Sequence, residues 1–146
     1  MKTQKEGKTM KKCCICDEMK ALCNEQKILS KIVNGFQFVQ MTKCYDTIPF
    51  MLQSSNEHDY FTALIDDGTT PYFRLEKIDE ANCCAQLSLL KPVDLKGRLA
   101  RTEKDLYALK KTSHCIHINA CCFCAITPLP INLLDRPLPI IECKST

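Results

Sequence analysis

The chain has 146 residues, 45% of them hydrophobic and 25% charged, and a formal net charge of +3. This composition is typical of a globular protein and excludes a chain that is disordered throughout. Its apolar runs are all far shorter than the roughly 18 residues of a membrane-spanning helix, and no apolar signal segment follows the basic start. We therefore expect a globular protein with no membrane partner.

Residues 1–12 are predicted to form a disordered basic arm, because Met10 is their only sizeable apolar side chain apart from the first residue. Residues 1–31 contain eight Lys but only four acidic residues, so positive charge is concentrated at this end. The arm has neither Arg nor an aromatic side chain on which bases could stack. We expect no nucleic-acid partner.

The segment 13–35 has helical periodicity. Its apolar side chains recur at steps of three, four and seven residues, at Ile15, Met19, Leu22, Leu29 and Val33. Gln26 occupies one position of the same stripe. Asp17 is a suitable N-cap, and Asn34 and Gly35 form a suitable end. The pattern predicts a helix over about 17–33 whose single apolar stripe packs on another element.

Residues 36–127 are predicted to form a β-rich domain of antiparallel strands. Segments rich in strand-forming residues are separated by turn residues, and the first candidates are 36–41, 48–53 and 60–66. The strongest hairpin pairs 73–78 with 83–90 across a turn at 79–82, because both segments alternate apolar side chains on one face.

The remaining β segments are less regular. Residues 94–107 are polar and predict a long loop, within an unassigned 93–109 segment, and 114–126 return to strand character. Residues 128–146 contain PLPI twice and predict an extended tail along an edge or a neighbour. The predicted fold is mainly β: an antiparallel β-sandwich-like domain with one N-terminal α-helix and an extended Pro-rich C-terminal tail.

Twelve cysteines are unusual in a chain without an export signal, because cytosolic thiols are normally kept reduced. Either they bind a metal or they are oxidised later. Neighbouring side chains on a strand point to opposite faces, so one of Cys83 and Cys84 faces outward, and likewise one of Cys121 and Cys122. We expect such thiols to link protomers, and the candidates are Cys13, Cys14, Cys16, Cys83, Cys84, Cys121, Cys122, Cys124 and Cys143. Cys23 and Cys115 are predicted to be small buried residues.

A zinc-binding Cys/His module is one alternative. Structural zinc takes four sulfur or nitrogen ligands, often in pairs with C-x₂₋₄-C spacing. Cys121 and Cys124 have this spacing, and His114 is close in sequence. His114 and His117 would lie on opposite faces of a strand, which disfavours both binding one metal. We predict no cofactor and no resident metal.

Sequence motifs of enzymes are absent: the chain has no nucleotide-binding loop, nucleophile elbow or zinc-protease motif. With twelve Cys and three His, a Cys–His pair arises by chance and carries little weight. A thiol enzyme would need one cysteine far more reactive than the others. We predict that the protein is not an enzyme.

Long cysteine-bearing strings resemble the spore coat and exosporium protein Y/Z family of endospore-forming bacteria. They are TIPF at 47–50, TPYFRLEKIDEANCCAQLSLLKP at 70–92 and KKTSHCIHINACCFCAI at 110–126, with CCICDEMKALCNEQ at 13–26 similar to the family's entry into a helix. The chain departs from the family pattern at His117, Asn119 and Pro128.

The resemblance implies a structural protein of the outermost spore layers that self-assembles into ordered sheets and becomes disulfide-linked. It implies synthesis in the mother cell, followed by oxidation once that cell lyses. The expected partners are further copies of the chain and other spore coat proteins. An adaptor that tethers other coat proteins without assembling itself is the remaining alternative.

Overall fold

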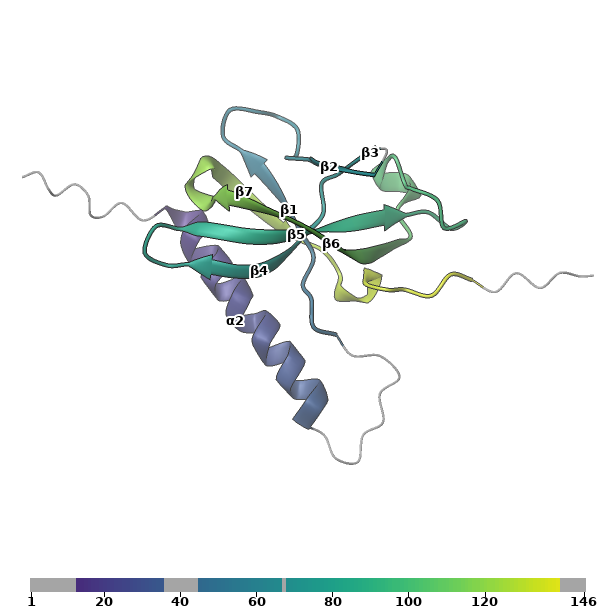
Figure 1. Cartoon of the computed structure of the whole chain (residues 1–146), viewed down its shortest axis with the longest axis horizontal. Helices are drawn as coiled ribbons and strands as arrows, with labels where there is room; N and C mark the ends of the chain where they lie inside the picture. The colour runs from purple at the N-terminus through teal and green to yellow at the C-terminus, as the bar shows by residue number, and fades with distance from the viewer. Residues whose placement is uncertain (1–12, 36–44, 67, 140–146) are drawn as a thin grey trace, which may run out of the picture.

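The computed structural model describes residues 13–35, 45–66 and 68–139. Its elements in chain order are α2 (Cys14–Gly35), β1 (Phe50–Ser54), β2 (Ala63–Ile65), β3 (Gly68–Thr70), β4 (Phe73–Asp79), β5 (Cys84–Val93), η1 (Glu103–Asp105), β6 (Ala108–Asn119), η2 (Ala120–Cys122), β7 (Phe123–Pro128) and η3 (Ile131–Leu133) (Figure 1). The predicted arm at 1–12, the strand candidate at 36–41 and residues 140–146 of the tail lie outside the described residues.

The helix α2 begins at Cys14, three residues before the predicted start, so Asp17 lies in the first turn and is not the N-cap. A carboxylate there still interacts favourably with the positive end of the helix dipole. The predicted stripe faces the sheet, with Ile15, Met19 and Gln26 buried. The C-terminal half of α2 projects beyond the strands (Figure 1).

A five-stranded antiparallel sheet has the order β6-β5-β4-β1-β7, and β2 and β3 form a separate hairpin. The predicted hairpin is confirmed, because β4 pairs with β5 from Phe73↔Leu89 to Asp79↔Cys84. The segment 114–126 is not one strand, because η2 divides it between β6 and β7. Residues 94–107 form no strand and contain only the short helix η1.

The sheet curls back on itself. β6 and β7 are its two edges, yet only the three residues of η2 join them. In a flat sheet the edges would lie about 19 Å apart, at about 4.8 Å per strand. Four residue steps reach only about 14 Å. β1 meets β4 at the single position Phe50↔Phe73, so the β1–β7 pair diverges from the other three strands, as in the predicted sandwich-like fold.

Side chains pack on both faces of the sheet. On one face, residues of β1, β4 and β5 contact α2 and η2 around Phe50, Leu52, Phe73 and Leu87. On the other, Met51 and Leu109 pack with Leu134, which follows η3. Since Met51 lies between Phe50 and Leu52 on one strand, alternation places these clusters on opposite faces. The helix therefore covers one face, and the segment after β7 covers part of the other.

Gln26 is the polar residue in the buried stripe of α2, and it ties the helix to two backbone segments. Its Nε2 donates a hydrogen bond to the carbonyl of Leu75 at 2.9 Å. Its Oε1 accepts one from the amide of Ile48 at 2.9 Å. The side chain is 8% exposed, so neither backbone group has ready access to water when the amide is removed.

We expect Gln26→Leu to lower the free energy of unfolding by about 2 kcal/mol or more, because it leaves two backbone groups without partners. The measurement is urea denaturation under non-reducing conditions. Lys27→Leu is the matched control, because Lys27 is the exposed neighbour, and it should change stability by less than about 0.5 kcal/mol. Equal effects of the two substitutions would contradict the assigned role.

Candidate functional site

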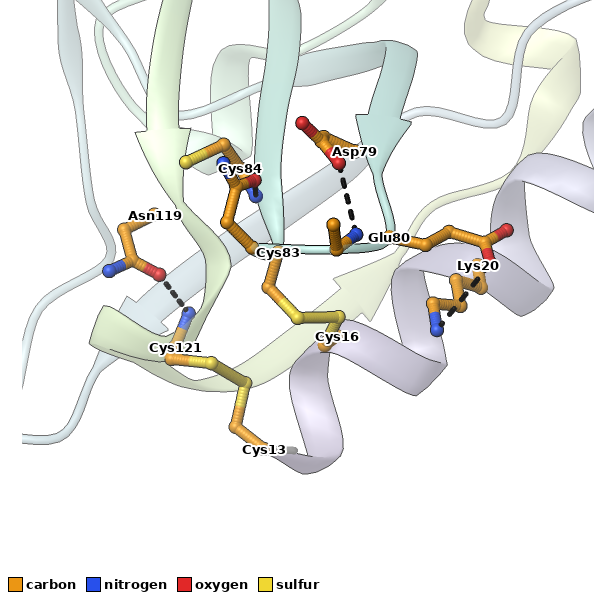
Figure 2. The surroundings of a disulfide bond; sticks show 11 residues. Cys13, Cys16, Lys20, Asp79, Glu80, Cys83, Cys84, Asn119 and Cys121 are labelled. Carbon is orange, nitrogen blue, oxygen red and sulfur yellow. Dashed lines mark hydrogen bonds and ion pairs between the residues drawn. A yellow bond between two sulfur atoms is a disulfide. The ribbon is translucent and has the colours of Figure 1, made fainter. Parts of the chain in front are cut away.

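Two disulfides attach the first turn of α2 to the β layer. They join Cys13 to Cys121 and Cys16 to Cys83, with Cα–Cα distances of 5.5 and 5.6 Å. Cys13 and Cys16 are three residues apart, about one helical turn, so both side chains point to the same side. Figure 2 shows the two disulfides lying next to each other at this end of the molecule.

The partner of Cys16 is at the tip of the β4–β5 hairpin. The amide of Cys83 donates to the carbonyl of Asp79 at 2.8 Å, and the side chain of Asp79 accepts from the amide of Ala81. Cys83 has a φ of 58°, a left-handed conformation that costs a residue with a Cβ about 1–2 kcal/mol. The disulfide to α2 and the turn hydrogen bonds together hold Cys83 in this conformation.

The partner of Cys13 is in η2, the connection between the two edge strands. The amide of Cys121 donates to the side chain of Asn119 at 3.0 Å. The amide of Ala120 donates to the carbonyl of Cys83 at 2.9 Å, and Ala120 is fully buried. The hairpin tip and η2 therefore contact each other directly, and each is also joined to α2.

Exposed free thiols surround this pair of disulfides. They are Cys14, Cys84, Cys122 and Cys124. The first three are each adjacent in sequence to a disulfide-bonded cysteine. In Figure 2 the sulfur of Cys84 points away from both disulfides. We call these eight residues the cysteine end of the molecule: Cys13, Cys14, Cys16, Cys83, Cys84, Cys121, Cys122 and Cys124.

The nine cross-link candidates divide into three groups. Cys13, Cys16, Cys83 and Cys121 are paired within the chain, in contrast to the expectation that they link protomers. Cys14, Cys84, Cys122 and Cys124 are free and exposed. Cys143 lies outside the described residues. The spacing of Cys13 and Cys16, about one helical turn, indicates that their side chains point to the same side, but it does not identify their disulfide partners.

The neighbouring pairs behave differently from each other. Cys83 is buried and Cys84 exposed, which is the predicted outcome, but Cys83 lies in the turn before β5 and not in the strand. Cys121 and Cys122 are both exposed, because they lie in η2 and not in a strand. Cys115 was expected to be buried but is exposed, because Ile116 and Ile118 occupy the inward positions of β6. Cys23 is partly buried against the core.

The zinc alternative is not assembled in this structure. Within residues 13–35, 45–66 and 68–139, no group of three or more His, Cys, Asp or Glu side chains could hold a metal. The sulfur of Cys121, one of the three proposed ligands with His114 and Cys124, is already bonded to Cys13. The alternative site therefore lacks one of its thiolates.

A second feature is a polar cavity of about 400 Å³ between α2 and β4. Arg74 forms an ion pair with Glu76 at 2.6 Å and donates to the hydroxyl of Thr47 at 2.7 Å. Asp46 pairs with Lys111 at 2.7 Å. Three charged residues of its lining, Asp46, Arg74 and Glu76, are therefore already paired, and the lining also contains Lys27 and Lys31.

This network shifts two carboxyl groups. Burial alone would raise the pKa of Glu76, but hydrogen bonds from Arg74 and Ser88 outweigh it and hold the pKa below its ordinary value of 4.5. Burial likewise opposes the shift of Asp46, and hydrogen bonds from Lys111 and Thr47 hold its pKa below 3.8. Both carboxylates are therefore more stable in the folded chain than in the unfolded one.

Comparisons with known proteins agree with the resemblance seen in the sequence. A family profile described as spore coat protein Z matches residues 1–131. Spore coat protein Z of Bacillus subtilis (strain 168) is 35% identical over 103 residues, which cover 62% of this chain and 68% of that protein. No solved structure matches the chain. In the part of the chain that the structure describes, no helix is long and apolar enough to cross a membrane.

The lowered carboxyl pKa values predict a loss of stability in acid. Each group contributes stability above its ordinary pKa, and the contribution disappears as the pH falls through the lower pKa of the folded state. Glu76→Gln should reduce stability at pH 7 by about 1 kcal/mol and weaken the fall between pH 5 and 3. Urea denaturation at several pH values across this range measures the change.

Glu80→Gln is the control, because the side chain of Glu80 is 72% exposed and its ion pair with Lys20 is long, at 3.9 Å. If Glu80→Gln weakened the acid-induced loss of stability as much as Glu76→Gln, the role assigned to Glu76 would be wrong.

Proposed function

Because the chain belongs to the spore coat protein Z family, we propose that it performs its structural role in the spore coat by assembling with copies of itself into an ordered layer. Exposed thiols then link neighbouring protomers as disulfides. The protein has no catalytic turnover in this role. Its place is the spore surface, in contact with other coat proteins.

The observation that carries this proposal is the set of free thiols at the cysteine end. Cys14, Cys84, Cys122 and Cys124 come from four different elements, and all face solvent. Exposed free thiols are a liability in a protein that remains monomeric. Several of them on one rigid end allow bonds to more than one neighbour. Such bonds give an assembled layer kinetic resistance to dissociation.

The outer edge of β6 supports a non-covalent contact between copies. Among the described residues it is covered only at Leu109, where Leu134 lies beside it. An uncovered strand edge presents unpaired amide and carbonyl groups that bind another strand. A contact between this edge and a different surface of the next copy is heterologous, and such contacts build rings or extended arrays.

The projecting half of α2 supports a second contact. Ile28 is 55% exposed and Ile32 is 48% exposed, on a part of the helix that extends beyond the strands. Both line a largely apolar cavity of about 380 Å³ with Ile48 and Ile131. Burying apolar surface of this kind against a neighbour is favourable, because it lowers the free energy of the assembly.

Oxidation after assembly accounts for so many free thiols in a protein that is made in a reducing compartment. Synthesis in the mother-cell cytoplasm keeps the exposed thiols reduced. Lysis of that cell places the finished layer in oxidising surroundings, where neighbouring thiols form disulfides. Assembly therefore comes first and covalent linkage second.

Negative-stain electron microscopy of the recombinant protein, with and without reductant, tests this proposal. We expect sheets or rings in both conditions, with the oxidised ones resistant to denaturant. The variant Cys14→Ala/Cys84→Ala/Cys122→Ala/Cys124→Ala should still assemble but dissociate in denaturant without reductant. Cys115→Ala is the matched control, because Cys115 is free and exposed but lies on β6, opposite Ser88.

Two outcomes would contradict the proposal. A protein that stays monomeric at high concentration, oxidised or reduced, would exclude self-assembly and favour a tethering adaptor. Oxidised arrays of the quadruple variant that resist denaturant as well as the wild type would exclude these four thiols as the links.

A further inference from the structure

The two disulfides at the cysteine end differ in accessibility. Cys16 is fully buried and Cys83 is 7% exposed. Cys121 is exposed and Cys13 is only partly buried. Thiol–disulfide exchange requires a thiolate to reach one sulfur of the bond, so accessibility determines which disulfide reacts. Exchange in the folded protein is therefore restricted to the Cys13–Cys121 bond.

The surroundings of the two sulfurs also set the direction of exchange. Cys121 is the more exposed residue of the two, which favours attack at its end of the disulfide. Cys13 directly precedes α2, and its carbonyl accepts a hydrogen bond from the amide of Cys16. A thiolate leaving at this position lies at the positive end of the helix dipole, which stabilises it. A better-stabilised thiolate is the better leaving group.

The free thiols next to this disulfide are poor nucleophiles toward it within their own chain. Attack by Cys122 on Cys121, or by Cys14 on Cys13, would join adjacent residues. Adjacent Cα atoms are about 3.8 Å apart, whereas disulfides usually need about 4.4–6.8 Å. Attack by either thiol on its own neighbour is therefore disfavoured, which favours a second molecule as the source of the thiolate.

We propose that Cys13–Cys121 is the exchangeable disulfide of this protein, in which an incoming thiolate bonds to Cys121 and displaces Cys13. The electron pair of the broken bond leaves with Cys13, which takes a proton from water. One disulfide forms and one breaks, so no oxidant is consumed. That the incoming thiolate belongs to another copy, at Cys14, Cys84, Cys122 or Cys124, rests on the proposed function.

The buried disulfide allows this exchange without unfolding. Cys16–Cys83 continues to hold α2 against the hairpin tip after Cys13 is released. Met19 stays in the core, and Gln26 keeps both of its hydrogen bonds. One disulfide thus retains the helix, while in the other the incoming thiol replaces Cys13 as the partner of the exposed Cys121.

Glutathione is the probe for a direct test. The dilute, oxidised wild-type protein is incubated anaerobically with reduced glutathione, trapped by alkylation and mapped by mass spectrometry. We expect glutathione on Cys121 and alkylation of Cys13, with both appearing at least about tenfold faster than any reaction of Cys16 or Cys83. Reaction of Cys16 or Cys83 at the same rate, or glutathione mainly on Cys13, would overturn the proposal.

A pair of variants separates exchange from general loosening of the fold. Cys13→Ala/Cys121→Ala should keep Cys16–Cys83 intact and unreactive while remaining folded by circular dichroism. Cys16→Ala/Cys83→Ala should still exchange at Cys121. If glutathione opens Cys16–Cys83 in the first variant at the wild-type Cys121 rate, accessibility is not what selects the bond. The wild-type mapping stands alone if either variant fails to fold.

The same test distinguishes failure of this inference from failure of the proposed function. Exchange of dilute protein with glutathione requires no assembly. Denaturant-resistant arrays formed by a protein that shows no selective exchange at Cys121 would leave the proposed function intact and contradict the inference. Selective exchange at Cys121 in a protein that never assembles would support the exchangeable disulfide and contradict the proposed function.

Discussion

The attachment of the first turn of α2 to the β layer is the constraint on which the rest of the structure depends. The two disulfides join residues separated by 108 and 67 positions in the chain. In the chain-entropy model each loop of this length, taken alone, destabilises the unfolded state by about 4–5 kcal/mol. The same two bonds fix the helix, the hairpin tip and η2 relative to one another.

This attachment also determines which sulfurs remain free. In each of three adjacent pairs, one cysteine is disulfide-bonded and the other is free and exposed. The pairs are Cys13 and Cys14, Cys83 and Cys84, and Cys121 and Cys122. A cysteine-rich segment can therefore contribute to internal stability and to external reactivity at neighbouring positions. The disulfides also fix the segments that carry these free thiols, so the exposed sulfurs of Cys14, Cys84 and Cys122 are attached to a rigid part of the molecule.

The curled sheet places this end where it is accessible. Because η2 spans the two edge strands, the connection stays short and brings Cys121 beside the hairpin tip, through the hydrogen bond from Ala120 to Cys83. The segment after β7 packs on the opposite face around Leu134. Among the described residues, the outer edge of β6 is bridged only at Leu109, and Ile28 and Ile32 on the projecting half of α2 are about half exposed. The exposed apolar surface of α2 and the exposed free thiols thus lie on different parts of one scaffold.

The sequence alone determined the elements that depend on neighbours a few residues apart. The helical stripe through Ile15, Met19 and Gln26, the hairpin around 79–82 and the cysteine-bearing strings that indicate the family are all read from local spacing. Only the tertiary structure decided that Cys13 meets Cys121, that η2 interrupts 114–126 and that Cys115 faces solvent. The physical reason is distance along the chain. Periodicity orients a side chain on its own helix or strand, whereas disulfide partners and strand order are set by the packing of segments far apart in sequence.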